Sequence, residues 1–191
     1  MPVYLLAGFA LLIFVFLRMM SPNLNMNFAF KAVYLVNIIA FLLHTTGLGL
    51  RWYISGHAPW SNTYESLVYI AWALSFSGII FSRTSAISLS LTSIMAGITL
   101  FVAHLSHIDP QITTLVPVLN SYWLTIHVSV ITASYGFFGL SMLLAMFCLF
   151  LFIIKKPGND NELARNILEA TRINEMSLIF GLCLLLSLIH I

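Results

Sequence analysis

Two short stretches of the chain bring together side chains that could coordinate a metal and bind an aromatic ligand. Residues 51–66 read RWYISGHAPWSNTYES and hold an arginine, a histidine, two tryptophans, two tyrosines and a glutamate. Residues 104–130 read HLSHIDPQITTLVPVLNSYWLTIHVSV and hold three histidines beside a Tyr-Trp pair. Neutral imidazole is the commonest axial ligand of haem iron, and aromatic walls with a cation suit a hydrophobic macrocycle that carries carboxylates. A quinone or lipid site would use the same residue types.

The composition indicates that these stretches belong to a membrane protein. Hydrophobic residues make up 60% of the chain and charged residues only 7%, whereas soluble domains are about one quarter charged. The net charge of +2 comes with no basic run, which excludes a nucleic-acid-binding surface. Cys148 and Cys183 lie far apart in apolar stretches and form no CxxC pattern, so neither a zinc site nor thiol chemistry is indicated.

The hydrophobic segments predict an all-α fold, a polytopic integral membrane helical bundle. About 20 apolar residues are needed to cross the hydrocarbon core. Five segments qualify, and a sixth begins near Met176 but reaches only Ile191. We therefore expect five full spans plus a truncated sixth. All of them belong to a single membrane domain, 1–191. The five full segments are about 2–18, 31–50, 64–81, 86–105 and 121–154.

The basic residues predict that the N-terminus lies outside. With that orientation, seven of the eight Lys and Arg residues fall on the inner side and only Arg51 lies outside, in agreement with the positive-inside rule. The external loops are then about 51–63 and 106–120, and the cytoplasmic loop is about 155–175. The inner residues are Arg18, Lys31, Arg83, Lys155, Lys156, Arg165 and Arg172.

Local patterns refine these loops. Asn62 followed by Glu65 three residues later is an N-cap pattern, which starts the third helix at Thr63 and gives the Glu65 carboxylate a capping role. In the cytoplasmic connection, apolar residues recur at helical spacing and predict a short helix lying along the membrane surface. These apolar residues are Leu163, Ile167 and Ala170.

Among the histidines, His127 is the strongest candidate ligand. Tyr122 and Trp123 mark the membrane boundary, and His127 lies about one helical turn further in, where an ionisable side chain is by default a functional candidate. The alternative is a neutral imidazole hydrogen-bonded to a neighbouring helix. For His44 we favour helix packing, and the aromatic residues of the first stretch equally suit the aromatic belt of any membrane protein.

Both stretches resemble one protein family. RWYISGHAPWSNTYESLVYIAW and DPQITTLVPVLNSYWLTIHVSV are similar to the haem-handling membrane protein of System II cytochrome c biogenesis, the CcsA or ResC type. The resemblance runs in order from about Ala29 to Leu186. It implies a bacterial inner (cytoplasmic) membrane protein whose functional face is extracytoplasmic. With a partner membrane subunit, such a protein moves b-type haem outward and presents it to apocytochrome c, whose CxxCH thiols add to the haem vinyl groups.

The resemblance also implies roles for particular residues. His127 matches the first external histidine of the family and is the implied axial ligand of the haem iron. Five residues match the outer loop of the family. The resemblance gives none of them an individual role, and it assigns no catalytic side chain. This group consists of Arg51, His57, Trp60, Asn62 and Glu65.

The chain also departs from the family pattern. The family continues into a tryptophan-rich segment, a membrane histidine and a second external histidine, none of which occurs here. We therefore expect an N-terminal part of a holocytochrome c synthase-type complex that binds haem weakly and is inactive alone. Two other functions remain open, a haem b-type electron-transfer subunit with paired histidines and a transporter fragment with interrupted helices.

Overall fold

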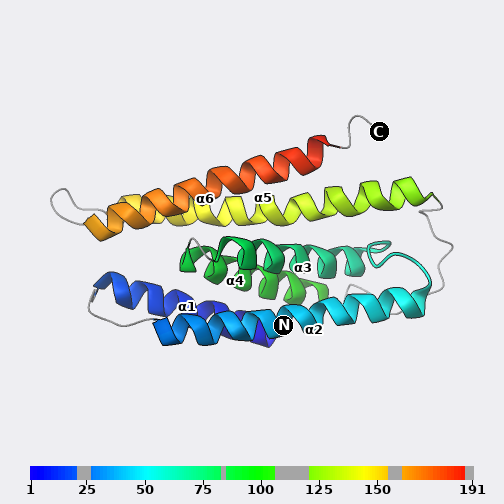
Figure 1. Ribbon diagram of the computed structural model, residues 1–191, viewed down its shortest axis with the longest axis horizontal. Coiled ribbons are helices and arrows are strands. Elements are labelled where there is room, and N and C mark those ends of the chain that lie inside the picture. The colour runs from blue at the N-terminus through cyan, green and yellow to red at the C-terminus, as the bar shows by residue number, and fades with distance from the viewer. Residues whose placement is uncertain (21–26, 83–84, 106–120, 155–160, 188–191) are drawn as a thin grey trace.

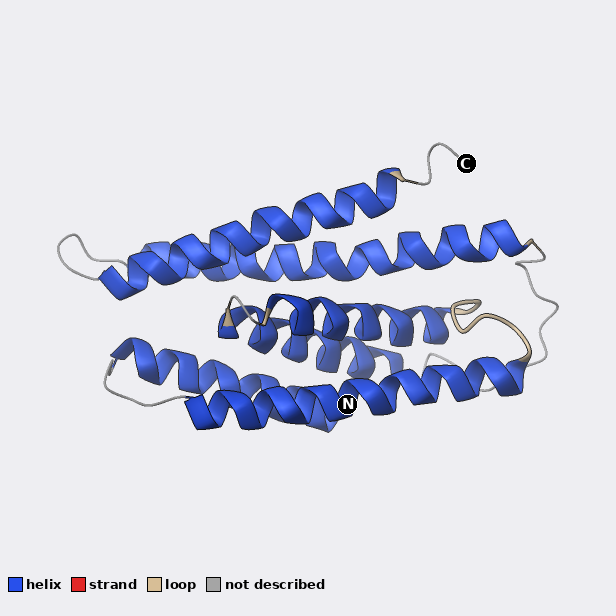
Figure 2. Ribbon diagram, in the orientation of Figure 1, coloured by secondary structure: helices blue, strands red, loops and turns tan. Residues whose placement is uncertain are grey.

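The regular secondary structure of the chain is helical throughout the part that the structure describes. The computed structural model describes residues 1–20, 27–82, 85–105, 121–154 and 161–187 (Figure 2). The expected all-α class is confirmed. The helices in these segments are α1 (Pro2–Met20), α2 (Asn27–Ser55), α3 (Thr63–Phe81), α4 (Ala86–Ala103), α5 (Tyr122–Ile154) and α6 (Asn161–Leu186).

The helices pack as an elongated bundle with their axes roughly aligned (Figure 1). α5 and α6 form a long hairpin along one side, α3 and α4 lie in the middle, and α1 and α2 lie on the opposite side. The most extensive packing joins α5 to α6, α3 to α4 and α1 to α4, while α3 also packs against α5. α3 and α5 run in the same direction, so their N-terminal ends lie at one end of the bundle together with the C-terminal end of α2.

The lengths and composition of these helices make the chain a multi-pass membrane protein. α2, α3, α4 and α5 are long and apolar enough to cross a bilayer, and the apolar stretch Pro2–Arg18 of α1 is slightly shorter. The polytopic helical bundle expected from the sequence is confirmed. The number of five full spans plus a sixth, and the external N-terminus, stay predictions.

Two boundaries differ from the expectation. α2 continues to Ser55, so residues 51–55 of the expected external loop are its last turn, and residues 56–62 alone join α2 to α3. The expected short surface helix near 155–175 was wrong. From Asn161 onward this segment is the first part of α6, because its apolar face packs against α5. That face consists of Leu163, Ile167, Ala170 and Ile173.

Polar side chains tie the helices together inside the bundle. Ser90 of α4 donates to the Gly8 carbonyl of α1 at 2.9 Å, and Ser93 of α4 donates to Asn37 Oδ1 of α2 at 2.6 Å. Ser177 of α6 donates to the Phe137 carbonyl of α5 at 2.7 Å. In a bilayer such bonds connect helices that the hydrophobic effect alone would not hold in one register.

Glycine sets the distance between α3 and α5. A Cβ added at Gly136 of α5 would lie 2.9 Å from Ala73 Cβ and 3.1 Å from the Leu74 backbone nitrogen of α3. These contacts are closer than van der Waals packing permits, so a side chain here would separate the two helices. The crossing fixes where the N-terminal half of α5 lies beside α3.

The close crossing predicts that Gly136→Ala destabilises the bundle. The methyl group must push against backbone atoms of α3, and overpacking of this kind costs about 2 kcal/mol. We expect the melting temperature of the protein in detergent or nanodiscs to fall by about 5 °C.

Gly49→Ala is the matched control, because a Cβ at this helical glycine of α2 meets no atom within 4 Å. Its melting temperature should stay the same or rise slightly, since alanine favours the helix. Equal melting temperatures for the two variants would contradict the proposed role of the crossing.

Candidate functional site

The loop between α2 and α3 is short and closely tied to both helices. Gly56 adopts φ of 70°, a left-handed conformation that suits glycine, and its N–H donates to the Trp52 carbonyl at 3.0 Å, which ends α2. Asn62 caps α3, because its Oδ1 accepts from the Glu65 backbone N–H at 2.7 Å. The predicted N-cap and the start of α3 at Thr63 are confirmed.

Glu65 is the centre of this loop. Its side chain is only 1% exposed, and both carboxylate oxygens accept strong hydrogen bonds. Oε1 accepts from Arg51 Nε at 2.9 Å, and Oε2 accepts from the Ser61 backbone N–H at 2.9 Å. The Arg51 guanidinium also lies over the Tyr64 ring, 5.0 Å from its centroid. Glu65 therefore does more than the expected capping, since it joins the end of α2, the loop and the start of α3.

His57 is held in one orientation by the same network. Its Nδ1 lies 3.1 Å from the Ala58 carbonyl oxygen and 4.0 Å from Glu65 Oε2. A carbonyl oxygen can only accept, so Nδ1 carries the proton in the neutral imidazole and the lone pair lies on Nε2. An Nδ1–H bonded to a carbonyl or carboxylate is typical of histidines that ligate metals through Nε2.

Aromatic rings form a continuous ladder from the loop along α3. Trp60 contacts Trp52 with ring centroids 5.7 Å apart and Tyr69 at 4.9 Å. Tyr69 stacks on Trp72 at 5.6 Å. The Trp60 indole nitrogen is buried and donates to no atom of the described residues, so a polar donor remains available within an aromatic wall.

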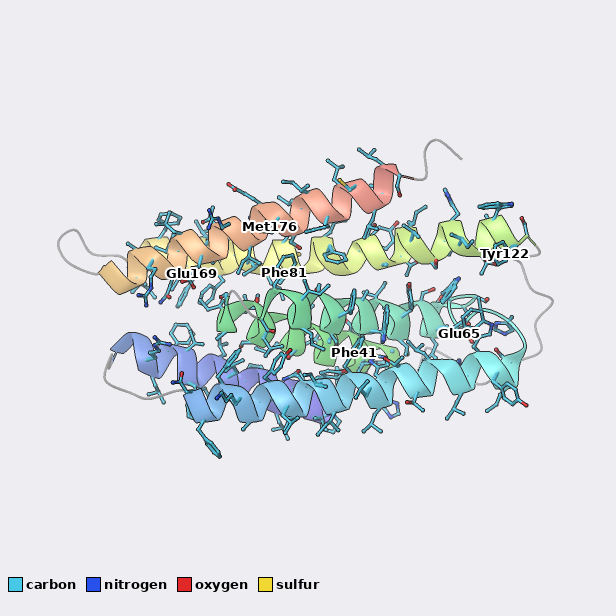
Figure 3. All side chains as sticks on the ribbon, in the orientation of Figure 1. Phe41, Glu65, Phe81, Tyr122, Glu169 and Met176 are labelled. Carbon is cyan, nitrogen blue, oxygen red and sulfur yellow. The ribbon has the colours of Figure 1, made fainter. Side chains whose placement is uncertain are left out.

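His127 lies on α5 at the axial level of this loop. It precedes Gly136 by nine residues, just as Tyr64 precedes Ala73, and Gly136 and Ala73 meet at the crossing of two parallel helices. Both residues are therefore about 13 Å from the crossing along their helices. Figure 3 likewise shows Tyr122, at the start of α5, and Glu65 at the same end of the molecule.

The His127 side chain is partly exposed and makes no hydrogen bond to another described residue. The alternative of an imidazole bonded to a neighbouring helix therefore finds no partner within the part of the chain that the structure describes. Such an imidazole retains a ring nitrogen for a ligand.

The other histidines do not join this site. His104 is the exposed C-cap residue of α4. His44 lies within α2, about two turns before Arg51, whereas His107 and His190 fall outside the described residues. Across the described segments, no group of three or more His, Cys, Asp and Glu side chains could hold a metal ion.

Comparison with known proteins identifies the family. Residues 60–190 match the family described as cytochrome C assembly protein. The chain belongs to this family. Its match covers about two thirds of the chain, including the N-cap of α3, the loop end with Trp60 and the whole of α5.

Individual relatives in the cytochrome c assembly family extend the similarity to nearly the full chain. Protein NrfI of Wolinella succinogenes is 52% identical over 184 residues, which cover 96% of this chain and 20% of that protein. Cytochrome c biogenesis protein CcsA of Prochlorococcus marinus is 36% identical over 152 residues, 74% of this chain and 48% of the relative. CcsA of Guillardia theta is 39% identical over 131 residues. The chain spans about half the length of the CcsA relatives and one fifth of Protein NrfI.

One feature of the loop between α2 and α3 escaped the sequence interpretation. The pattern assigned Glu65 to helix capping and Arg51 to a possible ligand contact, but the structure pairs them. A signal was present, because Arg51 and Glu65 are the only Lys, Arg, Asp or Glu residues between positions 51 and 66. Opposite charges that flank a short turn between two membrane helices have few other partners at that depth.

The two acceptor positions of Glu65 predict a strong effect of Glu65→Gln. Glutamine offers one acceptor oxygen and one amide donor, so either Arg51 Nε–H or the Ser61 N–H would face another donor. We expect the variant to lose about 2 kcal/mol of stability and to be cleaved faster by protease within residues 56–62.

Glu175→Gln, at an exposed position of α6, is the matched control and should behave as the wild type. Identical melting curves and cleavage rates for both variants would show that Glu65 does not organise the loop.

Proposed function

We propose that this chain handles haem for cytochrome c biogenesis and holds it at the shared outer end of α2, α3 and α5. The observation that carries the proposal is His127, an imidazole without a hydrogen-bond partner among the described residues, at the level of the Glu65-centred loop. Membership of the cytochrome c assembly family supports the same conclusion. The His127 nitrogen is the axial ligand of the haem iron in this proposal.

Other residues at this end of the bundle have the chemistry that suits an iron porphyrin. Trp52, Trp60 and Tyr69 offer aromatic surface against which a flat macrocycle packs. The buried indole N–H of Trp60 lacks an acceptor, and a haem propionate would supply one. His57 presents Nε2 as a second nitrogen with its proton fixed on Nδ1. These residues orient the haem, and Arg51 and Glu65 keep the loop in the shape that does so.

The chemical role of this chain is positioning. Haem contributes vinyl groups, to which the thiols of a CxxCH segment of apocytochrome c add to form thioethers. The chain's residues hold the iron, exclude water from the ring faces and leave a haem edge accessible, and orientation of this kind accounts for a large share of the acceleration of such additions. We assign no catalytic side chain, because the reacting thiols belong to the apocytochrome.

The proposed setting is the bacterial inner membrane, with the haem site on the extracytoplasmic face. The seven-to-one distribution of Lys and Arg supports an external end for α2, the loop and the start of α5. Apocytochrome c reaches the site from that side, and a partner membrane subunit of the System II synthase completes the complex.

His127→Gly tests the ligand assignment. In nanodiscs titrated with haem, we expect this variant to bind haem about 100-fold more weakly, a loss of about 3 kcal/mol. Added imidazole should enter the vacated position and restore the Soret band, which a merely structural role of His127 would not allow.

His104→Gly removes an exposed histidine from the same end of the bundle and should bind haem as the wild type does. Equal haem affinities for His127→Gly and the wild type would overturn the assignment of the ligand.

Cysteine labelling tests the orientation. In a Cys148→Ala/Cys183→Ala background, Tyr53→Cys lies at a position that is 87% exposed at the end of α2, and we expect an impermeant maleimide to label it on intact cells. Leu168→Cys, 70% exposed in α6, should be labelled only after the membrane is permeabilised. The reverse pattern would place the haem site in the cytoplasm.

A further inference from the structure

The inner face of α2 carries a polar side chain at every seventh position, and the middle one of three forms no well-aligned hydrogen bond within the part of the chain that the structure describes. Asn37, His44 and Arg51 are separated by seven residues, so they lie along one stripe of the helix. Asn37 accepts from Ser93 of α4, and Arg51 donates to Glu65 of α3. His44 lies between them, its two ring nitrogens are buried, and neither nitrogen meets the geometry of a hydrogen bond to another described residue.

A second unmatched group faces His44 from α1. Tyr4 is 4% exposed, and its buried hydroxyl makes no well-aligned hydrogen bond to another described residue. The Tyr4 and His44 rings are in contact, with centroids 6.1 Å apart and planes inclined at 57°. Two neighbouring helices therefore direct unsatisfied polar side chains toward the same part of the bundle.

The third helix places polar groups next to both side chains. His44 faces the Val68 carbonyl and Tyr4 faces Ser75, two turns apart on one face of α3. The Ser75 hydroxyl gives its proton to the Ala71 carbonyl at 2.9 Å and keeps acceptor capacity toward Tyr4. The remaining packing around Tyr4 is apolar, from Leu74 and Ala96 in the same cluster.

The chemistry of this cluster defines what it binds. A buried imidazole nitrogen or phenol without a partner costs about 1–3 kcal/mol each, and the hydrocarbon of a bilayer supplies no hydrogen bonds. The occupant must be small, uncharged and able both to donate and to accept, since the tyrosine donates while the imidazole offers one donor and one acceptor. Buried water with two to four polar partners meets each requirement.

We propose that Tyr4 and His44 form a hydration site in which bound water bridges the phenol of α1 to the imidazole of α2 and to the polar face of α3. The site lies one heptad inward from Arg51, beneath the outer loop, and does not depend on haem. It connects three helices through water in the way that Ser93 connects α4 to α2 directly.

Nuclear magnetic resonance of the 15N-histidine-labelled chain in nanodiscs tests the occupant. We expect a cross-relaxation signal between water and the His44 ring protons, assigned by its loss in His44→Phe, and we expect Tyr4→Phe to abolish or weaken it. A His44 signal without water contact would overturn the hydration site, even if the two side chains interact directly.

A double-mutant cycle tests the bridge. Tyr4→Phe keeps the ring contact and removes only the hydroxyl, so it should lower the melting temperature by about 3 °C when His44 is present. In the His44→Phe background the same change should have no effect, because the water has already lost its second partner. Equal shifts in the two backgrounds would show that no water links the two residues.

Discussion

Hydrocarbon offers no hydrogen bonds, and this constraint shapes the polar groups of the whole bundle. Each hydroxyl, amide or charge on an inward helix face must find its partner on the protein or in buried water. Ser90 meets a carbonyl of α1, Ser93 meets Asn37, and Ser177 meets a carbonyl of α5. These bonds fix the rotation and register of helices whose apolar surfaces alone would slide past one another.

The same constraint explains the outer loop. A buried carboxylate is tolerated only where donors surround it, and Glu65 has one from the preceding helix and one from the loop. The pairing with Arg51 closes the turn between α2 and α3 over only seven residues. His57 and Trp60 are held within that turn, so their polar atoms are oriented by the scaffold before any ligand binds. Preorganisation of this kind reduces the ordering cost of binding.

Helix packing then brings His127 of α5 to the same end of the bundle as the loop between α2 and α3. Gly136 lets α5 approach the backbone of α3, and the two helices run in parallel from there to their outer ends. His127 consequently reaches the level of Tyr64, although 63 positions separate them in the sequence. The haem-handling function proposed for this member of the cytochrome c assembly family rests on that convergence. Tyr4 and His44 lie further along the bundle from the loop, on α1 and α2.

The sequence by itself determined the helical class, the start of α3 at Thr63 and the outer-loop motif, because apolar segment length and N-cap chemistry are local properties. It also singled out His127 from its depth behind the Tyr-Trp pair. Only the tertiary structure decided that Glu65 pairs with Arg51, that α6 begins at Asn161 against α5, and that Tyr4 meets His44. These outcomes depend on which helix faces lie together, and that choice is made by contacts between distant segments, such as the glycine crossing of α3 and α5, which no local pattern encodes.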